Sequence, residues 1–287
     1  MLPPLEYIVP SDRFEACNFL AKNGSETKII AGGTDLVLSL RRGEVRPRYL
    51  LDISEIEELR KIEDGGDQIT IGAACTHTQI SESPMLKEHG GILSEASGWI
   101  ASRQIRNLGT IGGNVVNGSP AADTVPALMV LNGRLKIVSS NRHREVPLSD
   151  IYVGPYETNL GPHELVSHII VDKIPEGARY RFFRLTRRKA MATARINGGV
   201  LLRQKNSGGR IEDIRISVGS VTPRPCRMTR AEEFLMGAIP SEPTIERGCR
   251  IVGESMVELS GVRQSTEYKR PVVNVLVRRA LQDILAE

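Results

Sequence analysis

Two pairs of adjacent glycines, in the segments 31–35 and 110–114, constrain the fold of this chain most strongly. The first, Ala31-Gly32-Gly33-Thr34-Asp35, stands between a strand pattern and the start of a helix pattern. The second, Thr110-Ile111-Gly112-Gly113-Asn114, lies between a helix pattern and a segment that we expect to be extended. Paired glycines let the backbone take positive φ and let a bulky anion approach its N–H groups, and a helix start adds unpaired donors. Two such loops facing each other can clamp a pyrophosphate, although each pair alone also suits an ordinary turn.

The length of 287 residues predicts two or three packing units. Residues 1–57 read as a small α/β subdomain, and residues 58–172 as a second unit that contains the second glycine pair. Residues 177–287 read as a separate α+β domain, because strand-like segments at 181–185 and 214–218 precede three helix patterns. Within this scheme, Asn132-Gly133 predicts a tight hairpin turn, and Pro271 is expected near the first turn of the last helix.

Composition excludes several classes of protein. The mixture of 40% hydrophobic and 25% charged residues is ordinary for a globular chain, and a net charge of +4 does not by itself indicate nucleic acid. No apolar run approaches the roughly 20 residues that span a bilayer, and residues 1–6 lack the features of a signal peptide. We therefore expect a cytoplasmic protein without a membrane span.

The cysteines and histidines predict no metal site in this chain. Cys17, Cys75, Cys226 and Cys249 are too far apart to form a CxxC pair, so we expect reduced thiols rather than a zinc or iron–sulfur site. The five histidines form no HExxH pattern, and neither GxGxxG nor the P-loop pattern occurs. Any chemistry is thus expected to belong to a bound organic cofactor.

Further segments accompany the glycine pairs. They are Asn117-Gly118-Ser119-Pro120-Ala121-Ala122-Asp123, Phe183-Arg184-Leu185-Thr186-Arg187-Arg188 and Val218-Gly219-Ser220-Val221-Thr222-Pro223-Arg224-Pro225. With these, and most specifically with the RNxGTIGGN segment from Arg106 to Asn114, the chain resembles the FAD-binding (medium) subunit of the molybdenum hydroxylases, the family of carbon monoxide dehydrogenase and xanthine dehydrogenase. The resemblance spans nearly the whole sequence.

The resemblance implies an α+β fold. Two FAD-binding subdomains of the vanillyl-alcohol-oxidase/PCMH type, at 1–57 and 58–172, would hold FAD between them. A C-terminal domain of the CO dehydrogenase flavoprotein type, at 177–287, would close the site. The cofactor-binding positions implied are Ile29, Ile30, Ala31, Gly32, Gly33, Thr34, Asp35, Leu36, Thr76, His77, Ile100, Thr110, Ile111, Gly112, Gly113, Asn114, Asp123, Leu165, Val166 and Arg184. No catalytic side chain and no metal ligand are implied.

Some of these positions carry specific expectations. Asp123 matches an acid near the adenosine part of FAD, and either Val166 or Leu165 matches an apolar position of the adenine pocket. Arg184 stands where relatives commonly place lysine, and Ile100 where some place an aromatic residue against the flavin. His77 is expected either to reach the flavin edge or to be satisfied by a local backbone partner.

The function implied is electron transfer within a molybdenum hydroxylase. A large molybdopterin subunit would oxidise the substrate, and a small subunit with [2Fe–2S] clusters would pass electrons to FAD here and on to an acceptor such as NAD. The assembly would be a dimer of heterotrimers. One alternative is a free-standing flavin reductase similar to UDP-N-acetylenolpyruvoylglucosamine reductase, although no motif supplies the protonating side chain that such an enzyme needs.

The other alternative rests on the segment 179–189, which contains six basic residues and no acid, with Phe182 and Phe183 between them. Such a pattern can bind single-stranded nucleic acid. It is also typical of a strand with solvated arginines on one face and phenylalanines in the core. We favour this second interpretation, and we expect no nucleic-acid partner. The resemblance to the molybdenum hydroxylases offers another role for this segment. Candidate contacts with a dinucleotide acceptor or an acidic partner are Arg187, Arg188 and Lys189.

Overall fold

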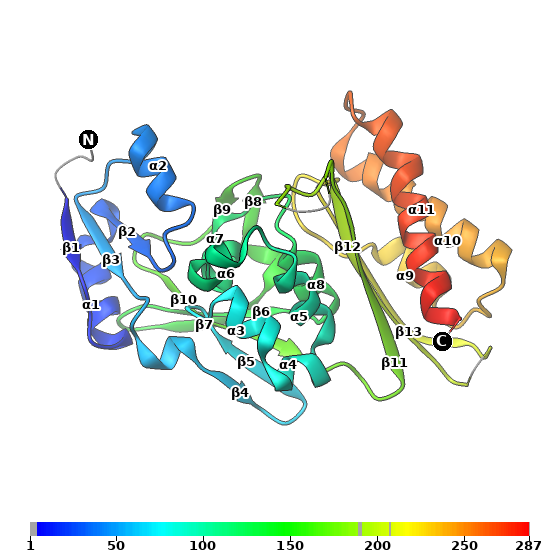
Figure 1. Ribbon diagram of the computed structural model, residues 1–287, viewed down its shortest axis with the longest axis horizontal. Helices are drawn as coiled ribbons and strands as arrows, with labels where there is room; N and C mark the ends of the chain where they lie inside the picture. The colour runs from blue at the N-terminus through cyan, green and yellow to red at the C-terminus, as the bar shows by residue number, and fades with distance from the viewer. Residues whose placement is uncertain (1–4, 189–190, 207, 287) are drawn as a thin grey trace.

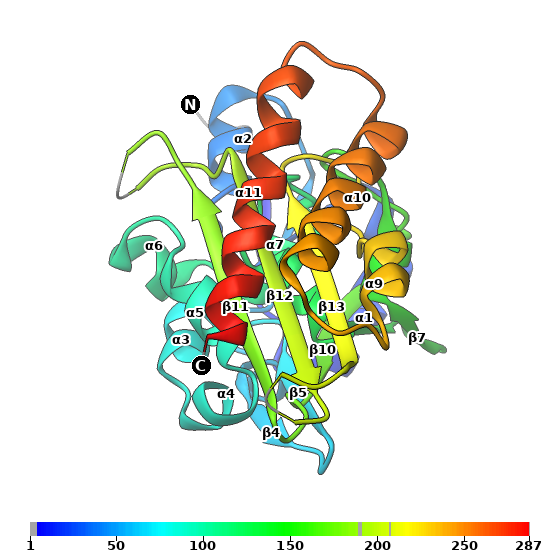
Figure 2. The same ribbon diagram turned by 90° about the vertical axis from the view of Figure 1, so that its right-hand side faces the viewer.

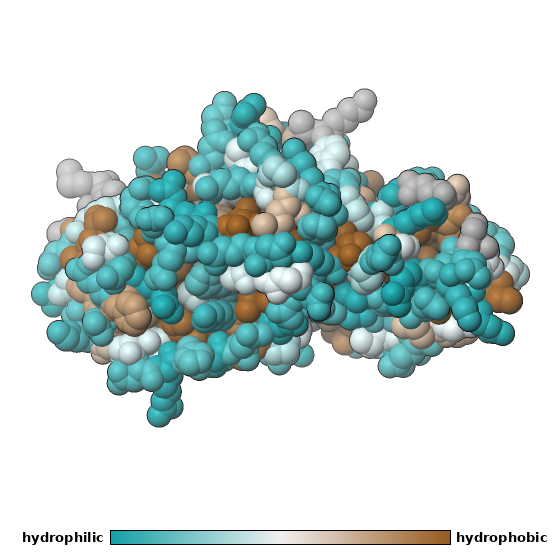
Figure 3. Space-filling view, turned by 90° about the horizontal axis from the view of Figure 1, so that it is seen from below, coloured by the Kyte–Doolittle hydropathy of each residue, from teal (hydrophilic) through white to brown (hydrophobic). Residues whose placement is uncertain are grey.

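Three main sheets follow one another along the longest axis of the molecule (Figure 1). The structure is a computed structural model, and it describes residues 5–188, 191–206 and 208–286. None of the helices in these ranges is long and apolar enough to cross a membrane. On the face seen in Figure 3, apolar side chains occur singly or in small groups within a largely hydrophilic surface.

The first unit contains a parallel sheet in the order β1-β3-β2. Its elements are β1 (Glu6–Ile8), α1 (Arg13–Asn23), η1 (Gly24–Glu26), β2 (Thr27–Ile30), α2 (Leu36–Arg42), β3 (Tyr49–Asp52) and η2 (Glu57–Arg60). Helix α1 begins after Asp12, whose carboxylate accepts a hydrogen bond of 2.8 Å from the N–H of Glu15. Its buried face, with Leu20 at the centre, packs in one cluster with Leu51 of β3. A small parallel sheet and its helices thus make up this part of the chain, and the chain leaves β2 directly into the first glycine pair.

The central unit contains an antiparallel sheet in the order β4-β5-β10-β6-β7. Its strands are β4 (Ile62–Asp64), β5 (Gln68–Gly72), β6 (Arg134–Val138), β7 (His143–Pro147) and β10 (Leu165–Asp172). Its helices are α3 (His77–Glu82), α4 (Pro84–His89), α5 (Gly91–Gly98), α6 (Arg103–Leu108), α7 (Ile111–Asn117) and α8 (Thr124–Val130). The short helix η3 (Leu148–Ile151) and the ribbon of β8 (Tyr152–Gly154) and β9 (Glu157–Thr158) complete the unit. Its strands and helices share one large hydrophobic core.

Three local expectations were wrong. Residues after the second glycine pair are helical rather than extended, since α7 continues to Asn117 and ends at Gly118, whose φ of 62° suits a left-handed cap. Asn132 (φ 52°) and Gly133 close the end of α8 instead of a hairpin, and the N–H of Gly133 donates to the carbonyl of Leu128. Pro271 lies inside α11 (Thr266–Leu285). In each case the residue type occurs in more than one kind of local structure. Packing against other parts of the chain decides which of these structures forms.

The C-terminal unit is a sheet between two layers of helices. Its strands, in antiparallel order, are β11 (Ala178–Leu185), β12 (Ile196–Gln204) and β13 (Ile211–Gly219). Figure 2 shows α9 (Thr229–Leu235), α10 (Glu242–Ser260) and α11 lying across one face of this sheet. The other face packs on α5 and α8 of the central unit, so closely that a Cβ at Gly199 would lie 2.8 Å from Cδ1 of Ile92.

Strand β11 takes part in two hydrophobic cores. Phe182 belongs to the core of the central unit, whereas its neighbour Phe183 packs against the C-terminal core. This follows from the alternation of side chains along a strand. The expected strand is present and both phenylalanines contact hydrophobic cores, but the expectation of solvated arginines is wrong at Arg184, whose side chain is buried. Arg187 and Arg188 are exposed, and Lys189 lies outside the described residues.

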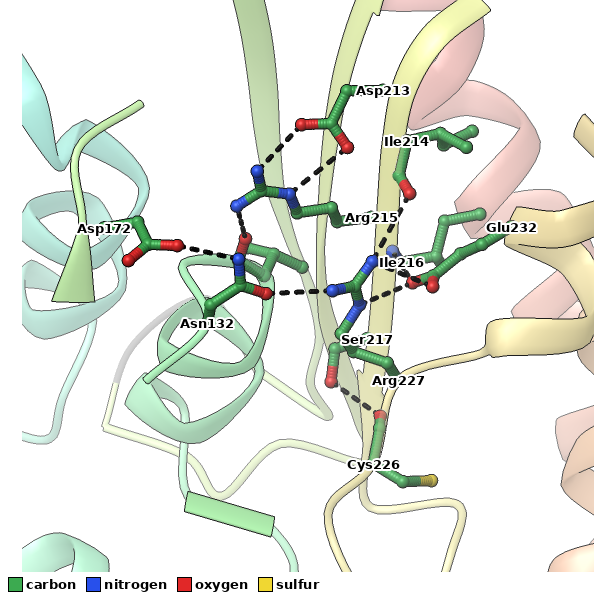
Figure 4. A network of polar contacts seen from close by, with 11 residues as sticks. Asn132, Asp172, Asp213, Ile214, Arg215, Ile216, Ser217, Cys226, Arg227 and Glu232 are labelled. Carbon is green, nitrogen blue, oxygen red and sulfur yellow. Dashed lines mark hydrogen bonds and ion pairs between the residues drawn. The ribbon is translucent and has the colours of Figure 1, made fainter. Parts of the chain in front are cut away.

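A polar network also joins the central and C-terminal units (Figure 4). The side chain of Asn132 donates to Asp172 at 2.8 Å and accepts from Arg227 at 2.9 Å. The guanidinium of Arg227 also donates to both carboxylate oxygens of Glu232, and Arg215 donates to the carbonyl of Val130. These contacts fix the turn after α8 against β13, so the two units meet through polar as well as apolar groups.

Candidate cofactor-binding site

The first glycine loop lies against residues 108–109, which directly precede the second loop. A Cβ at Gly32 would be 1.9 Å from the carbonyl oxygen of Leu108, at the end of α6. A Cβ at Gly109 would contact both Thr34 of the first loop and His77. Only glycine allows so close an approach at residue 32, and this approach brings the first loop to the residues that lead into the second loop, although the two are far apart in sequence.

The first loop has free hydrogen-bond donors. Within the described chain, no group accepts a hydrogen bond from the backbone N–H of Gly32, Gly33, Thr34 or Asp35. Gly33 has a φ of 66°, which is the left-handed conformation that favours glycine. Helix α2 after this loop has seven residues, so its dipole is short and the loop amides are the main attraction for an anion. Four consecutive free amides suit a diphosphate.

The second loop is built differently. Its N–H groups donate within the protein, from Ile111 to Cys75, from Gly112 to Ala73, and from Gly113 and Asn114 to Thr110. Gly112 is needed for packing on Ala73, whose Cβ would be 2.6 Å from an added Cβ. A Cβ at Gly113 would meet only Oγ1 of Thr110, at 3.0 Å. The N–H groups of this loop are therefore not free to bind an anion. The loop is held in place by its hydrogen bonds, and the space beside Gly113 is open except for Thr110.

Asp123 is the centre of a buried polar cluster that joins the central and C-terminal units. Arg184 of β11 forms an ion pair of 3.1 Å with its carboxylate, and both side chains are less than a tenth exposed. Asn197 of β12 donates to Oδ1 of Asp123 at 2.7 Å and also reaches the carbonyls of Ala121 and Ala122. Burial raises the pKa of Asp123, and the bonds from Asn197 and Arg184 oppose this shift. Asp123 thus has protein partners on its carboxylate and holds the loop that leads into α8.

Asn197 is the site residue that the sequence analysis missed. It is a single amide in an otherwise apolar and glycine-containing strand, Ile196-Asn197-Gly198-Gly199-Val200, and such an isolated buried polar group was the available signal. Next to this cluster, Thr124 donates to Oδ1 of Asn114 at 2.6 Å. The second glycine loop is thereby tied to the Asp123 cluster.

His77 packs beside Gly109, whose carbonyl accepts a hydrogen bond from the backbone N–H of His77. Its side chain is 2% exposed, and its Nδ1 has no hydrogen-bond partner in the described chain. Burial and the nearby Arg106 lower the pKa of His77 to about 4, so the ring is neutral at pH 7. The expectation of a local backbone partner for the ring is not met at Nδ1. Thr76 caps α3 through a reciprocal pair of hydrogen bonds with Gln79.

The apolar candidate residues divide by burial. Ile30, Ile111, Leu165 and Val166 have side chains within hydrophobic cores, so a cofactor would reach them mainly through their backbones. Leu165 and Val166 point into different cores, as neighbours on a strand do. The half-buried candidates are Ile29, Ala31, Leu36 and Ile100. Trp99, beside Ile100, is 49% exposed.

Comparison with known families identifies the class of this protein. Residues 3–174 match the FAD binding domain in molybdopterin dehydrogenase, and residues 181–284 match the CO dehydrogenase flavoprotein C-terminal domain. The chain belongs to this family of FAD-binding flavoprotein subunits of dehydrogenases. The resemblance, the fold class, FAD as the cofactor of this chain and an oxidoreductase role are thereby confirmed.

Individual relatives cover the full length. The chain is 31% identical over 280 residues to the nicotine 6-hydroxylase medium subunit of Paenarthrobacter nicotinovorans, which spans 98% of this chain and 97% of the relative. It is 29% identical to the carbon monoxide dehydrogenase medium chain of Hydrogenophaga pseudoflava, over 98% of this chain and 97% of the relative. A carbon monoxide dehydrogenase structure from H. pseudoflava superposes with a TM-score of 0.91 at 28% identity, covering 100% of this chain and 99% of that chain.

Proposed function

We propose that this chain is the FAD-carrying medium subunit of a three-subunit molybdenum hydroxylase, and that it passes electrons from iron–sulfur clusters to a soluble acceptor such as NAD. The observation that carries the proposal is the row of four backbone N–H groups from Gly32 to Asp35 that have no partner within the described chain. The chain also belongs to a family whose model is an FAD-binding domain. Those amides fit the diphosphate of FAD. Bound FAD would supply one- and two-electron redox chemistry.

The protein would bind and orient the cofactor without acting on a proton. The Gly32–Asp35 amides would hold the diphosphate, and Gly113 would leave room for it. The Asp123–Arg184–Asn197 cluster would hold the C-terminal domain against the central unit. The orphaned Nδ1 of His77 is a polar group that a nearby ligand would satisfy. In this proposal no side chain of the protein acts as an acid or a base during electron passage.

A groove beside the 120–121 segment supports an anionic acceptor. It has a volume of about 410 Å³ and is lined by Pro120, Ala121, Tyr156, Ala194, Arg195, Ser220, Ser265 and Lys269. Neither Arg195 nor Lys269 forms an ion pair with a described residue. Burial and the neighbouring Arg195 and Arg263 lower the pKa of Lys269, so a negative group here would relieve repulsion. The diphosphate of NAD has this charge. We favour these cations over Arg187, Arg188 and Lys189 as the acceptor contacts.

The partners proposed are a molybdopterin-binding large subunit and a [2Fe–2S] small subunit, in a cytoplasmic dimer of heterotrimers. Relatives named as medium subunits or medium chains, and one named as a dehydrogenase complex subunit, support this arrangement. The chain carries no candidate metal cluster of its own among the residues described. In this proposal the electrons come to FAD from the iron–sulfur clusters of the small subunit.

Two measurements test the proposal. Acid denaturation of the purified chain should release FAD, and neither FMN nor flavin bound to the precipitate should be found. The chain alone should oxidise no purine, aldehyde or carbon monoxide, and substrate-dependent flavin reduction should appear only after the molybdenum and iron–sulfur subunits are added. Turnover by the chain alone would instead support the free-standing reductase.

A further inference from the structure

The turn between α5 and α6 is held in an unusual conformation by one side chain. Ala101 has a φ of 38°, a left-handed value that an alanine rarely adopts because its Cβ clashes with the backbone. Arg106 donates from Nη1 to the carbonyl of Ile100 at 2.9 Å and to that of Ala101 at 3.5 Å. The guanidinium thus bonds both carbonyls that flank the left-handed residue.

Arg106 is also an unneutralised charge. It is half-buried, it forms no ion pair with any described residue, and its Nε and Nη2 have no partner within the described chain. It lies close enough to lower the pKa of buried His77, which in turn packs beside Gly109. Positive charge therefore stands next to the glycine loops, without an acid to compensate it.

The turn and α6 expose three large apolar side chains among the exposed polar residues Arg103, Gln104 and Asn107. Trp99, Ile105 and Leu108 are 49%, 38% and 58% exposed, and the carbonyl of Leu108 touches Gly32 of the first loop. The six residues of α6 span roughly 9 Å, a length comparable to the ribityl chain that separates the diphosphate of FAD from its ring. With the diphosphate at Gly32–Asp35, the ring would lie toward the turn at residues 99–101.

We propose that Arg106 is a positioning residue for the flavin ring. It holds the 99–101 turn in its left-handed form, and so fixes the exposed Trp99 and the half-buried Ile100 at the place toward which the ring would lie. The proposal rests on FAD binding at the glycine loops. Its test therefore includes a measurement on the protein without FAD, which remains informative if that binding site is elsewhere.

The chain offers a direct reporter and a matched control. Trp99 is the sole tryptophan, so its emission reports the turn itself. Arg103 lies on the same helix, but its side chain is 73% exposed and pairs with Glu82 at 3.5 Å. We expect Arg106→Met to shift the emission of the FAD-free protein and to weaken FAD binding about ten- to a hundredfold, as for the loss of a charged hydrogen bond. Arg103→Met should change neither quantity.

Two further variants separate positioning from general stability. Ala101→Gly removes the cost of the left-handed residue, so in the Arg106→Met background it should restore most of the FAD affinity. Arg106→Lys keeps a charged donor, should remain folded and should bind FAD with intermediate affinity. The proposal is overturned if Arg106→Met lowers only the melting temperature while Trp99 emission and FAD affinity stay at wild-type values. It is equally overturned if Ala101→Gly restores nothing.

Discussion

A methyl group on Gly32 would lie 1.9 Å from the carbonyl oxygen of Leu108 and 2.9 Å from Cα of Gly109. The neighbours are backbone atoms, which cannot rotate away. We therefore expect Gly32→Ala to separate the first loop from α6, to destabilise the protein by about 1–3 kcal/mol and to abolish FAD retention. Gly98→Ala is the control, because an added Cβ there meets nothing closer than 3.9 Å. Thermal unfolding and flavin absorbance measure both effects, and normal FAD content in Gly32→Ala would contradict the described packing.

Valine at Gly33 and valine at Gly113 should both reduce FAD affinity, but for different reasons. Gly33 has a φ of 66°, so valine there strains the backbone by at least about 1 kcal/mol and also covers the loop amides. Gly113 is not left-handed, and its Cβ position is open except for Thr110. Gly113→Val should therefore keep its melting temperature while losing tenfold or more in affinity. Calorimetric FAD titration with parallel melts checks this, and wild-type affinity in both variants would make the loops ordinary turns.

His77 should make stability depend on pH. Its pKa is about 4 in the folded protein and 6.5 unfolded, so the unfolded chain binds the extra proton between these values. The stabilisation is complete above pH 6.5 and is lost as pH falls toward 4, with an upper limit of about 3 kcal/mol. Urea unfolding at pH 7 and pH 5 should show a smaller difference for His77→Phe than for wild type. Equal differences would mean that the ring is not buried in neutral form.

Asn197→Ala should destabilise both the domain interface and the FAD site. The substitution removes a 2.7 Å bond to buried Asp123 and two bonds to the 121–122 carbonyls. A buried bond to a charged group is worth about 1.5–3 kcal/mol. Asn159→Ala, which removes one bond to the carbonyl of Asp150 in an exposed setting, should cost less. Chemical unfolding of both variants measures the difference, and an equal cost would argue against a special role for the cluster.

Lys269→Met tests the acceptor groove. In the reconstituted complex, we expect KM for NAD to rise about three- to tenfold, while reduction of an uncharged dye is unchanged. Lys22→Met is the control, since Lys22 is an exposed cation on α1. Steady-state kinetics at two ionic strengths should show the effect shrinking with salt. An unchanged KM would place the acceptor elsewhere.

Sequence patterns predicted the strand before Gly32 and the helix start after it, because buried apolar residues mark both locally. They did not predict the helical form of residues 115–117 or the role of Asn132-Gly133, since glycine and asparagine suit helix ends and hairpins alike. The sequence also did not predict that backbone N–H groups of the second loop donate hydrogen bonds to the carbonyls of Ala73 and Cys75. Asn197 was missed because its partner, Asp123, lies 74 residues away in the chain. Local signals locate loops, whereas long-range contacts decide what their polar groups do.

The alternation of Phe182 and Phe183 between two hydrophobic cores constrains the length of β11 more strictly than its composition. Inserting or deleting one residue here would turn each phenylalanine to the wrong side of the sheet. Such a change would damage both cores at once, whereas a substitution would affect one. During divergence this segment should accept point changes but no change of length. The two domains would thus be inherited together and not exchanged as independent modules.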